Sequence, residues 1–157
     1  IEAASQIGLT VGLVGSAPVV QQQAYNAGDL EQHLLAHTPV IDLRGQTTLL
    51  SLAGACQRAK AVITVDAGPL HIAAAVGTPT MAIVGNDRDG VGASPIRLWL
   101  PRCDHVSRTI SSFSCSACAD NRFRNDHCLV EGHPCMAGVQ AEPVIEWLRQ
   151  IAAMPEA

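Results

Sequence analysis

The sequence predicts an α/β fold: a Rossmann-like parallel sheet with helices on both faces. Two observations support it. Strands that are apolar throughout alternate with helical stretches, as in parallel sheets that are covered on both sides. Strands also end at Gly15, before Asp66 and at Gly85. Because ligands of such sheets bind beyond the carboxyl ends of the strands, the loops at these three ends are the expected site.

The chain opens with a strand and two helices. Leu9–Gly15 is predicted as an apolar strand. Ser16 has the side chain of a helix cap, and it precedes a helical stretch over Gln21–Ala27 that Gly28 would end. A second helix is predicted over Asp29–His37, where leucines recur on one face.

Two further strand–helix units follow. Val40–Leu43 is a short strand, and the next helix is predicted from Thr48 to about Arg58, with Thr47 as its cap. A strand over Ala61–Val65 leads into a helix over Leu70–Val76. Gly77 then ends that helix before a strand over Thr80–Val84. Apolar side chains keep helical spacing in the first of these helices at Leu49, Leu50, Leu52, Ala53 and Cys56.

The last third of the chain is less regular. Asn86–Pro101 reads as a polar loop, and Asp104–Thr109 as one more strand. A cysteine-rich insertion occupies residues 111–138, and an amphipathic helix over Pro143–Met154 closes the chain. We therefore expect a single domain over residues 1–157.

The composition is that of a globular protein. Of 157 residues, 48% are hydrophobic and 15% charged, and the net charge of -4 argues against nucleic acid as a partner. The apolar runs are shorter than the roughly 20 residues that span a bilayer, and no signal peptide is visible. Since the first residue is Ile1 and the chain starts within a helical pattern, we expect a processed or deliberately cut fragment of a longer chain.

The most informative segment surrounds Asp66, where an apolar strand passes through a short loop into an Ala-rich helix. A helix N-terminus carries unpaired N–H groups and roughly half a positive charge, and it suits phosphate. This predicts phosphate contacts for the backbone of Gly68, Leu70 and His71. Gly68 and Pro69 are also consistent with a tight turn alone.

The run from Asp42 to Gly85 resembles the C-terminal, nucleotide-binding half of glycosyltransferase family 9, the bacterial heptosyltransferases of lipopolysaccharide core synthesis and their relatives. In the family pattern, Gly-(Lys/Gln)-Thr/Ser opens a helix. A strand then runs into Asp-(Ser/Ala)-Gly-Pro-x-His, and an Ala-rich helix leads to Gly-Thr-Pro and a last strand. The matching residues are Gly45, Gln46, Thr47, Asp66, Gly68, Pro69, His71, Gly77, Thr78, Pro79 and Gly85.

The resemblance implies one half of a GT-B enzyme that inverts the anomeric centre and needs no cofactor for its chemistry. This half would hold a nucleotide-diphosphate sugar, typically ADP-heptose. A missing N-terminal half would bind a lipopolysaccharide core or other glycan acceptor and supply the catalytic base, so no catalytic residue is expected in this chain. The full enzyme would be cytoplasmic in a bacterium, with peripheral association at the inner membrane.

The resemblance also suggests roles for single residues. Asp66 would accept hydrogen bonds from sugar hydroxyls, or cap the following helix. His71 would reach the diphosphate, or be a partly buried structural histidine. The remaining donor contacts would come from Gly15, Ser16, Gln46, Thr47 and Ala67, with capping as the alternative for Ser16 and Thr47.

Two departures from the family pattern affect the donor pocket. Ala67 stands where relatives often have Ser or Thr, which removes one hydroxyl contact to phosphate. Relatives also often carry a Glu after the first Gly, where this chain has Gln21–Gln23. The sequence therefore leaves the identity of the sugar donor undetermined. The candidate anion contacts among the arginines, with simple solvation as the alternative, are Arg88, Arg97, Arg122 and Arg124.

Four cysteines form a second motif. Cys115, Cys118, Cys128 and Cys135 begin with a Cys-x-x-Cys pair and suit a tetrahedral structural site for zinc or iron. The alternative is a set of reduced structural thiols. Two other functions stay open: a non-catalytic nucleotide- or metal-binding module, and a GT-B relative with another donor or epimerase chemistry.

Overall fold

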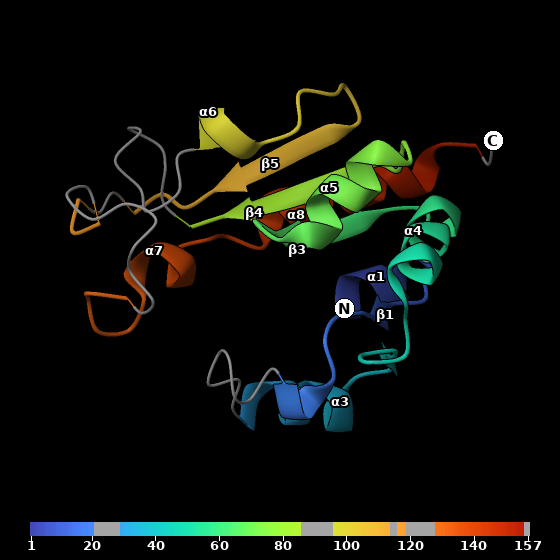
Figure 1. Ribbon diagram of the computed structural model, residues 1–157, viewed down its shortest axis with the longest axis horizontal. Helices are drawn as coiled ribbons and strands as arrows, with labels where there is room; N and C mark the ends of the chain where they lie inside the picture. Colours follow the sequence, from blue (N-terminus) through green and yellow to red (C-terminus); the bar gives the residue numbers. More distant parts are fainter. Residues whose placement is uncertain (21–28, 86–95, 114–115, 119–127, 156–157) are drawn as a thin grey trace.

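The computed structural model describes residues 1–20, 29–85, 96–113, 116–118 and 128–155. Its strands form two parallel sheets (Figure 1). In the smaller sheet, β1 (Gly12–Leu13) pairs with β2 (Ile41–Asp42). The larger sheet has the order β3 (Val62–Val65), β4 (Thr80–Val84), β5 (Val106–Ile110). The helices are α1 (Glu2–Gln6), α3 (Asp29–His37), α4 (Leu49–Arg58), α5 (Gly68–Ala75), α6 (Ile96–Trp99), α7 (Pro134–Ala137) and α8 (Glu142–Ala153).

The larger sheet is the centre of the molecule. In Figure 1, α5 lies across one face of this sheet and α8 lies behind it, so the expected helical layers are present. The core forms where α5 packs on β3 and β4 and where α4 packs on α5. Its buried residues include Leu70, Ala73, Met81 and Ala82. The small alanines allow α5 to lie close to the strands, which brings the start of α5 to the carboxyl end of β3.

The α/β class with parallel sheets is confirmed, and α3 and β4 have the predicted bounds. The single sheet is not observed, because the described residues contain no ladder between β1 and β3. The strand predicted over seven residues from Leu9 is reduced to the two residues of β1. Helices α6 and α7 lie in segments for which the sequence predicted no element.

The start of α4 corrects one prediction. Its cap is Thr48, not Thr47: the Thr48 hydroxyl accepts from the Ser51 N–H at 3.2 Å, and the Ser51 hydroxyl accepts from the Thr48 N–H at 2.7 Å. This reciprocal capping box needs a side-chain acceptor at the cap and another three residues later, and Thr47 lies one residue too early for it.

The outer edge of the larger sheet is exposed. Among the described strands, β3 pairs only with β4, and Ile63 and Val65 are 41% and 46% exposed. Leu49 and Leu50, in the first turn of α4, are also exposed, although their spacing predicted burial. No helix within the described ranges has the length and apolar character needed to cross a membrane.

Candidate functional site

The carboxyl end of β3 and the N-terminus of α5 form the centre of the candidate site. Ala67 occupies the cap position, and no side chain of the described residues forms a capping hydrogen bond there. This excludes Asp66 as the cap, which was the alternative to a ligand contact. Because the first N–H groups of a helix lack intrahelical acceptors, an α5 start without a side-chain cap is open to an anion.

Gly68 is the first residue of α5, and the chain itself does not require glycine there. Its φ is not among the positive values, and a Cβ built on it would have no atom within 4 Å. A tight turn therefore does not explain this glycine. The open space lies on the exposed side of the helix start, where a ligand would approach the backbone.

The other two predicted contacts of this helix differ from each other. His71 is exposed, so the reading as a partly buried structural histidine does not apply. Leu70 is fully buried, and its N–H already donates to the Ala67 carbonyl at 3.0 Å. The backbone of Leu70 is thus occupied within the turn, and its side chain belongs to the core.

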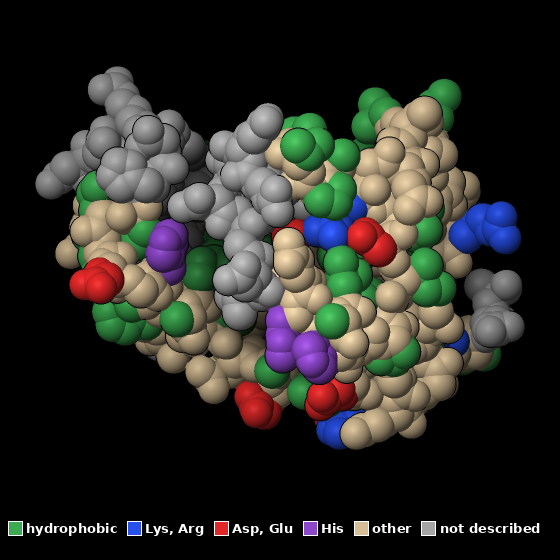
Figure 2. All heavy atoms as spheres, turned by 90° about the horizontal axis from the view of Figure 1, so that it is seen from below, with side chains coloured by type: hydrophobic (Ala, Val, Ile, Leu, Met, Phe, Trp, Pro, Cys, Tyr) green, Lys and Arg blue, Asp and Glu red, His purple; other side chains and the backbone are tan. Residues whose placement is uncertain are grey.

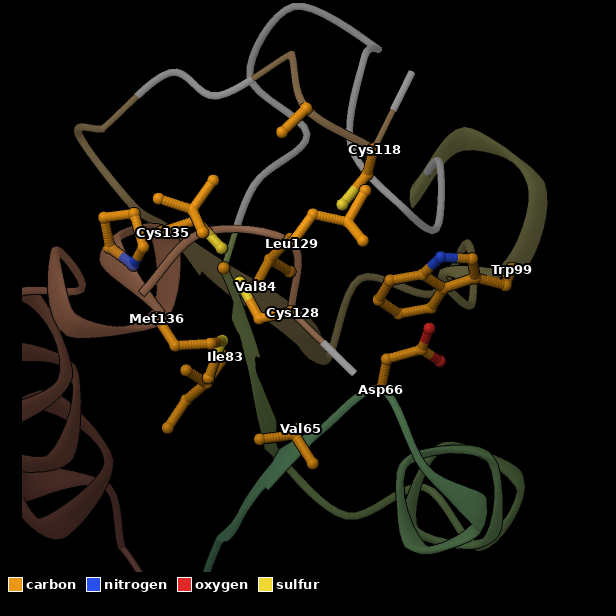
Figure 3. Close-up of a pocket in the computed structure, with 14 residues that line it drawn as sticks. Val65, Asp66, Ile83, Val84, Trp99, Cys118, Cys128, Leu129, Cys135 and Met136 are labelled. Atoms are coloured by element: carbon orange, nitrogen blue, oxygen red, sulfur yellow. The ribbon is translucent and has the colours of Figure 1, made fainter. Parts of the chain in front are cut away.

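Beside Asp66 lies a hollow with a volume of about 260 Å³. Its lining is mostly apolar and comes from the ends of β3 and β4, from α6 and from the segment around α7. Figure 3 shows the Asp66 carboxylate at the edge of the hollow next to the Trp99 indole. Among the described residues that line the hollow, Asp66 alone carries a carboxylate. The arrangement combines one hydrogen-bond acceptor with an aromatic and aliphatic wall.

Two lining residues, Trp99 and Met136, had no predicted role in the site. Trp99 comes from the short helix α6, and Met136 from α7. A Cβ at Gly85 would lie 2.6 Å from the Met136 sulfur, so glycine at the end of β4 admits this side chain. No periodic pattern marks α6 or α7, and only the glycine at the strand end hinted at a close approach.

The remaining predicted donor contacts gather at the ends of β1 and β2. The Gly45 N–H donates to the Gly15 carbonyl at 2.9 Å, so the two loops touch through their backbones. The Gln46 amide donates to the Asp42 carbonyl at 2.9 Å. Ser16 is exposed and lies outside the helical residues 18–20, which places Ala17 rather than Ser16 next to that helix. Thr47 is half-buried.

Arg44 anchors this second group of loops. Its guanidinium is buried and binds both oxygens of Asp42 at 2.9 Å, and it also pairs with Glu31 of α3. The hydrogen bonds from Arg44 hold the pKa of Asp42 below its usual value, and the same pairing raises the pKa of Arg44. The two loop groups belong to different sheets: Gly15 to Thr47 follow β1 and β2, and Asp66 to His71 follow β3.

The cysteine cluster is only partly described. Cys118, Cys128 and Cys135 all line the hollow beside Asp66 (Figure 3). Cys115 lies outside the described residues. Within the described ranges, no three histidine, cysteine or acidic side chains are placed to hold a metal ion. The zinc or iron site therefore stays a prediction. Cys56 is separate, and burial raises the pKa of its thiol.

Comparisons with known proteins agree on the family. The sequence profile of glycosyltransferase family 9 (heptosyltransferase) matches residues 1–125. A search of curated proteins found no match. Two solved structures match over 96% of this chain: ADP-heptose LPS heptosyltransferase II of E. coli, with 22% identity and a TM-score of 0.63, and a family 9 glycosyl transferase of Veillonella parvula DSM 2008, with 20% identity and a TM-score of 0.60.

The match covers only part of each relative. This chain spans 39% of the E. coli structure and 40% of the Veillonella parvula structure. At these identities the likeness concerns the fold, and it extends over one portion of a longer protein.

Proposed function

The chain belongs to glycosyltransferase family 9, and from this premise we propose that it binds the sugar donor, a nucleotide-diphosphate sugar. The observation that carries the proposal is the start of α5, which has no side-chain cap and is open around Gly68. In this proposal the diphosphate contacts the backbone at Gly68 and the side chain of His71. The helix dipole would favour the negative charge that develops on the leaving nucleotide.

The sugar is assigned to the hollow beside Asp66. The carboxylate accepts hydrogen bonds from sugar hydroxyls, and the Trp99 ring covers an apolar face of the ligand. ADP-heptose is the proposed donor because the family profile is that of heptosyltransferases. A family member with another donor is the competing function, and titration with ADP- and UDP-sugars separates the two.

Replacement of Gly68 by alanine tests the proposal directly. Gly68→Ala adds a methyl group where the chain offers free space, so the free energy of unfolding should stay within about 1 kcal/mol of the parent. The same methyl group would hold a phosphate away from the backbone, and we expect affinity for an ADP-sugar to fall about tenfold or more, as measured by calorimetry.

Gly54→Ala is the matched control. Gly54 lies in α4, and a Cβ there also meets no atom within 4 Å. This variant should bind the ADP-sugar like the parent. Equal affinity of Gly68→Ala, Gly54→Ala and the parent would contradict phosphate binding at the start of α5. The predicted structural metal is tested separately, by metal analysis of the purified chain and of a Cys118→Ser variant.

A further inference from the structure

A second hollow is lined by residues of α6, of β5 and of the loop between them. These elements lie at the β5 edge of the larger sheet, opposite β3 (Figure 1). The hollow has a volume of about 540 Å³. Its lining includes Val106 and Arg108, from the first half of β5. The hollow beside Asp66 instead lies at the carboxyl ends of β3 and β4. The two hollows have no described lining residue in common, although α6 contributes to both.

Positive charge is concentrated in this hollow, which we call the arginine groove. Arg97, Arg102 and Arg108 line it, and these are three of only ten Lys and Arg residues in a chain of net charge -4. All three are exposed. The net negative charge of the chain does not account for a local excess of positive charge, so the three arginines are a specific feature of this surface.

The described residues provide no ion-pair partner for the guanidinium groups of the arginine groove. In the part of the chain that the structure describes, none of the three forms an ion pair within 4.0 Å. The one acid in the lining, Asp104, is exposed and has no ion pair there either. Arg102 donates one hydrogen bond, to the Arg97 carbonyl at 3.5 Å, and this bond orients its side chain along the end of α6.

We propose that the arginine groove binds a soluble phosphomonoester about the size of a phosphorylated monosaccharide. Guanidinium groups present paired donors that match phosphate oxygens, and three of them on one surface exceed what a single carboxylate requires. Apolar side chains of Leu100, Pro101 and Val106 complete the lining and suit the carbon skeleton that bears the phosphate. The volume falls in the range of small-ligand sites and is larger than inorganic phosphate needs.

Calorimetric titration of the chain with glucose 6-phosphate at low salt tests the proposal. We expect saturable binding that weakens about tenfold in each of Arg97→Ala, Arg102→Ala and Arg108→Ala. Arg58→Ala removes one exposed positive charge from α4 and should change the affinity less than twofold. If Arg58→Ala lost as much affinity for glucose 6-phosphate as the three groove variants, net charge alone would explain the effect, and the proposal would be overturned. The absence of binding, or equal binding of glucose, would also overturn it.

Two further arms identify the site and the source of the phosphate. Gly68→Ala should bind glucose 6-phosphate like the parent, because its methyl group lies at the start of α5; a loss would place the ligand there instead. Failure of the donor proposal would thus leave this result unaffected. Flotation with phosphatidic acid vesicles, if it occurs without glucose 6-phosphate binding, would assign the groove to a lipid surface and overturn the proposal.

Discussion

Thr78 shows how a single buried hydroxyl connects three elements. Its side chain donates to the Cys56 carbonyl of α4 at 2.7 Å, and its N–H donates to the Ala73 carbonyl of α5 at 3.1 Å. Its own carbonyl accepts from the Thr80 hydroxyl at 2.7 Å. The resemblance identified Thr78 only as part of a motif, since a long-range partner 22 residues away leaves no local pattern in a sequence.

Thr78→Val keeps the shape of this side chain and removes its hydroxyl. The Cys56 carbonyl then loses the hydrogen bond from Thr78 and keeps the one from the Ala59 N–H, at 3.1 Å. We expect the free energy of unfolding to fall by roughly 1–2 kcal/mol in urea denaturation. Thr10→Val, at an exposed position, should change it by less than about 0.5 kcal/mol. A Thr78→Val variant as stable as Thr10→Val would contradict this role.

Asp42 makes stability depend on pH. Its pKa is lowered by the hydrogen bonds from the Arg44 side chain and then by the Arg44 N–H. Because the unfolded carboxyl has a pKa of about 3.9, its contribution is fully present above that pH and is lost as the pH falls through the lower folded value. The free energy of unfolding should therefore fall less from pH 5 to pH 2.5 in Asp42→Asn than in the parent, as measured by denaturation at the two pH values. The same loss in both proteins would be inconsistent with this role.

At the scale of elements, Gly45 determines how the loops after β1 and β2 meet. Its φ is 70°, and a Cβ there would lie 2.9 Å from the Ala17 Cβ and 3.0 Å from the Ala17 Cα. Contact with backbone cannot be relieved by rotating a side chain. The glycine therefore serves both the turn and the close approach that brings Gly15 next to Gln46.

Gly45→Ala should destabilise the chain by about 2–4 kcal/mol, through left-handed strain of roughly 1–2 kcal/mol together with overpacking. Gly8 provides the control, because it has a φ of 78° and open space around its position. Gly8→Ala should show the strain alone, so the difference between the two variants in thermal denaturation measures the contact with Ala17. Equal losses would show that this contact contributes nothing.

Which elements the sequence predicts depends on their length and regularity. α3 and α8 carry helical periodicity and β4 is a continuous apolar run, and all three were found at or within one residue of their predicted bounds. α6 and α7 have four residues each, too few for a periodic signal, and both bring residues into the hollow beside Asp66. Thus the motif around Asp66 was predictable, whereas the opposite wall of the hollow was not.

At the scale of the whole molecule, the sequence predicted strands but not their partners. An apolar run shows that a strand is buried, but pairing depends on contacts between distant segments. In the structure β1 and β2 pair apart from β3, β4 and β5. The two groups of predicted donor contacts, one after β1 and β2 and one after β3, were therefore expected on one sheet and lie on two.

The last prediction concerns the activity of the chain by itself. An inverting transfer needs a base aligned with the acceptor hydroxyl opposite the leaving group. In the part of the chain that the structure describes, Asp66 is the only carboxylate that lines its hollow, and in our proposal it is engaged by sugar hydroxyls. The chain also spans only about two fifths of the solved relatives. We therefore expect it to bind an ADP-sugar without transferring the sugar.

Calorimetry and a product assay on the same preparation test both parts of this expectation. Saturable binding of ADP-heptose, with no glycoside formed above the protein-free blank when a glycan acceptor is added, is the expected result. A full-length family 9 enzyme in parallel shows that donor and acceptor are competent. Turnover by the chain would contradict this expectation and mean that the chain carries its own base. Loss of that turnover in Asp66→Asn, with ADP-heptose affinity unchanged, would then identify Asp66 as the base rather than a sugar contact.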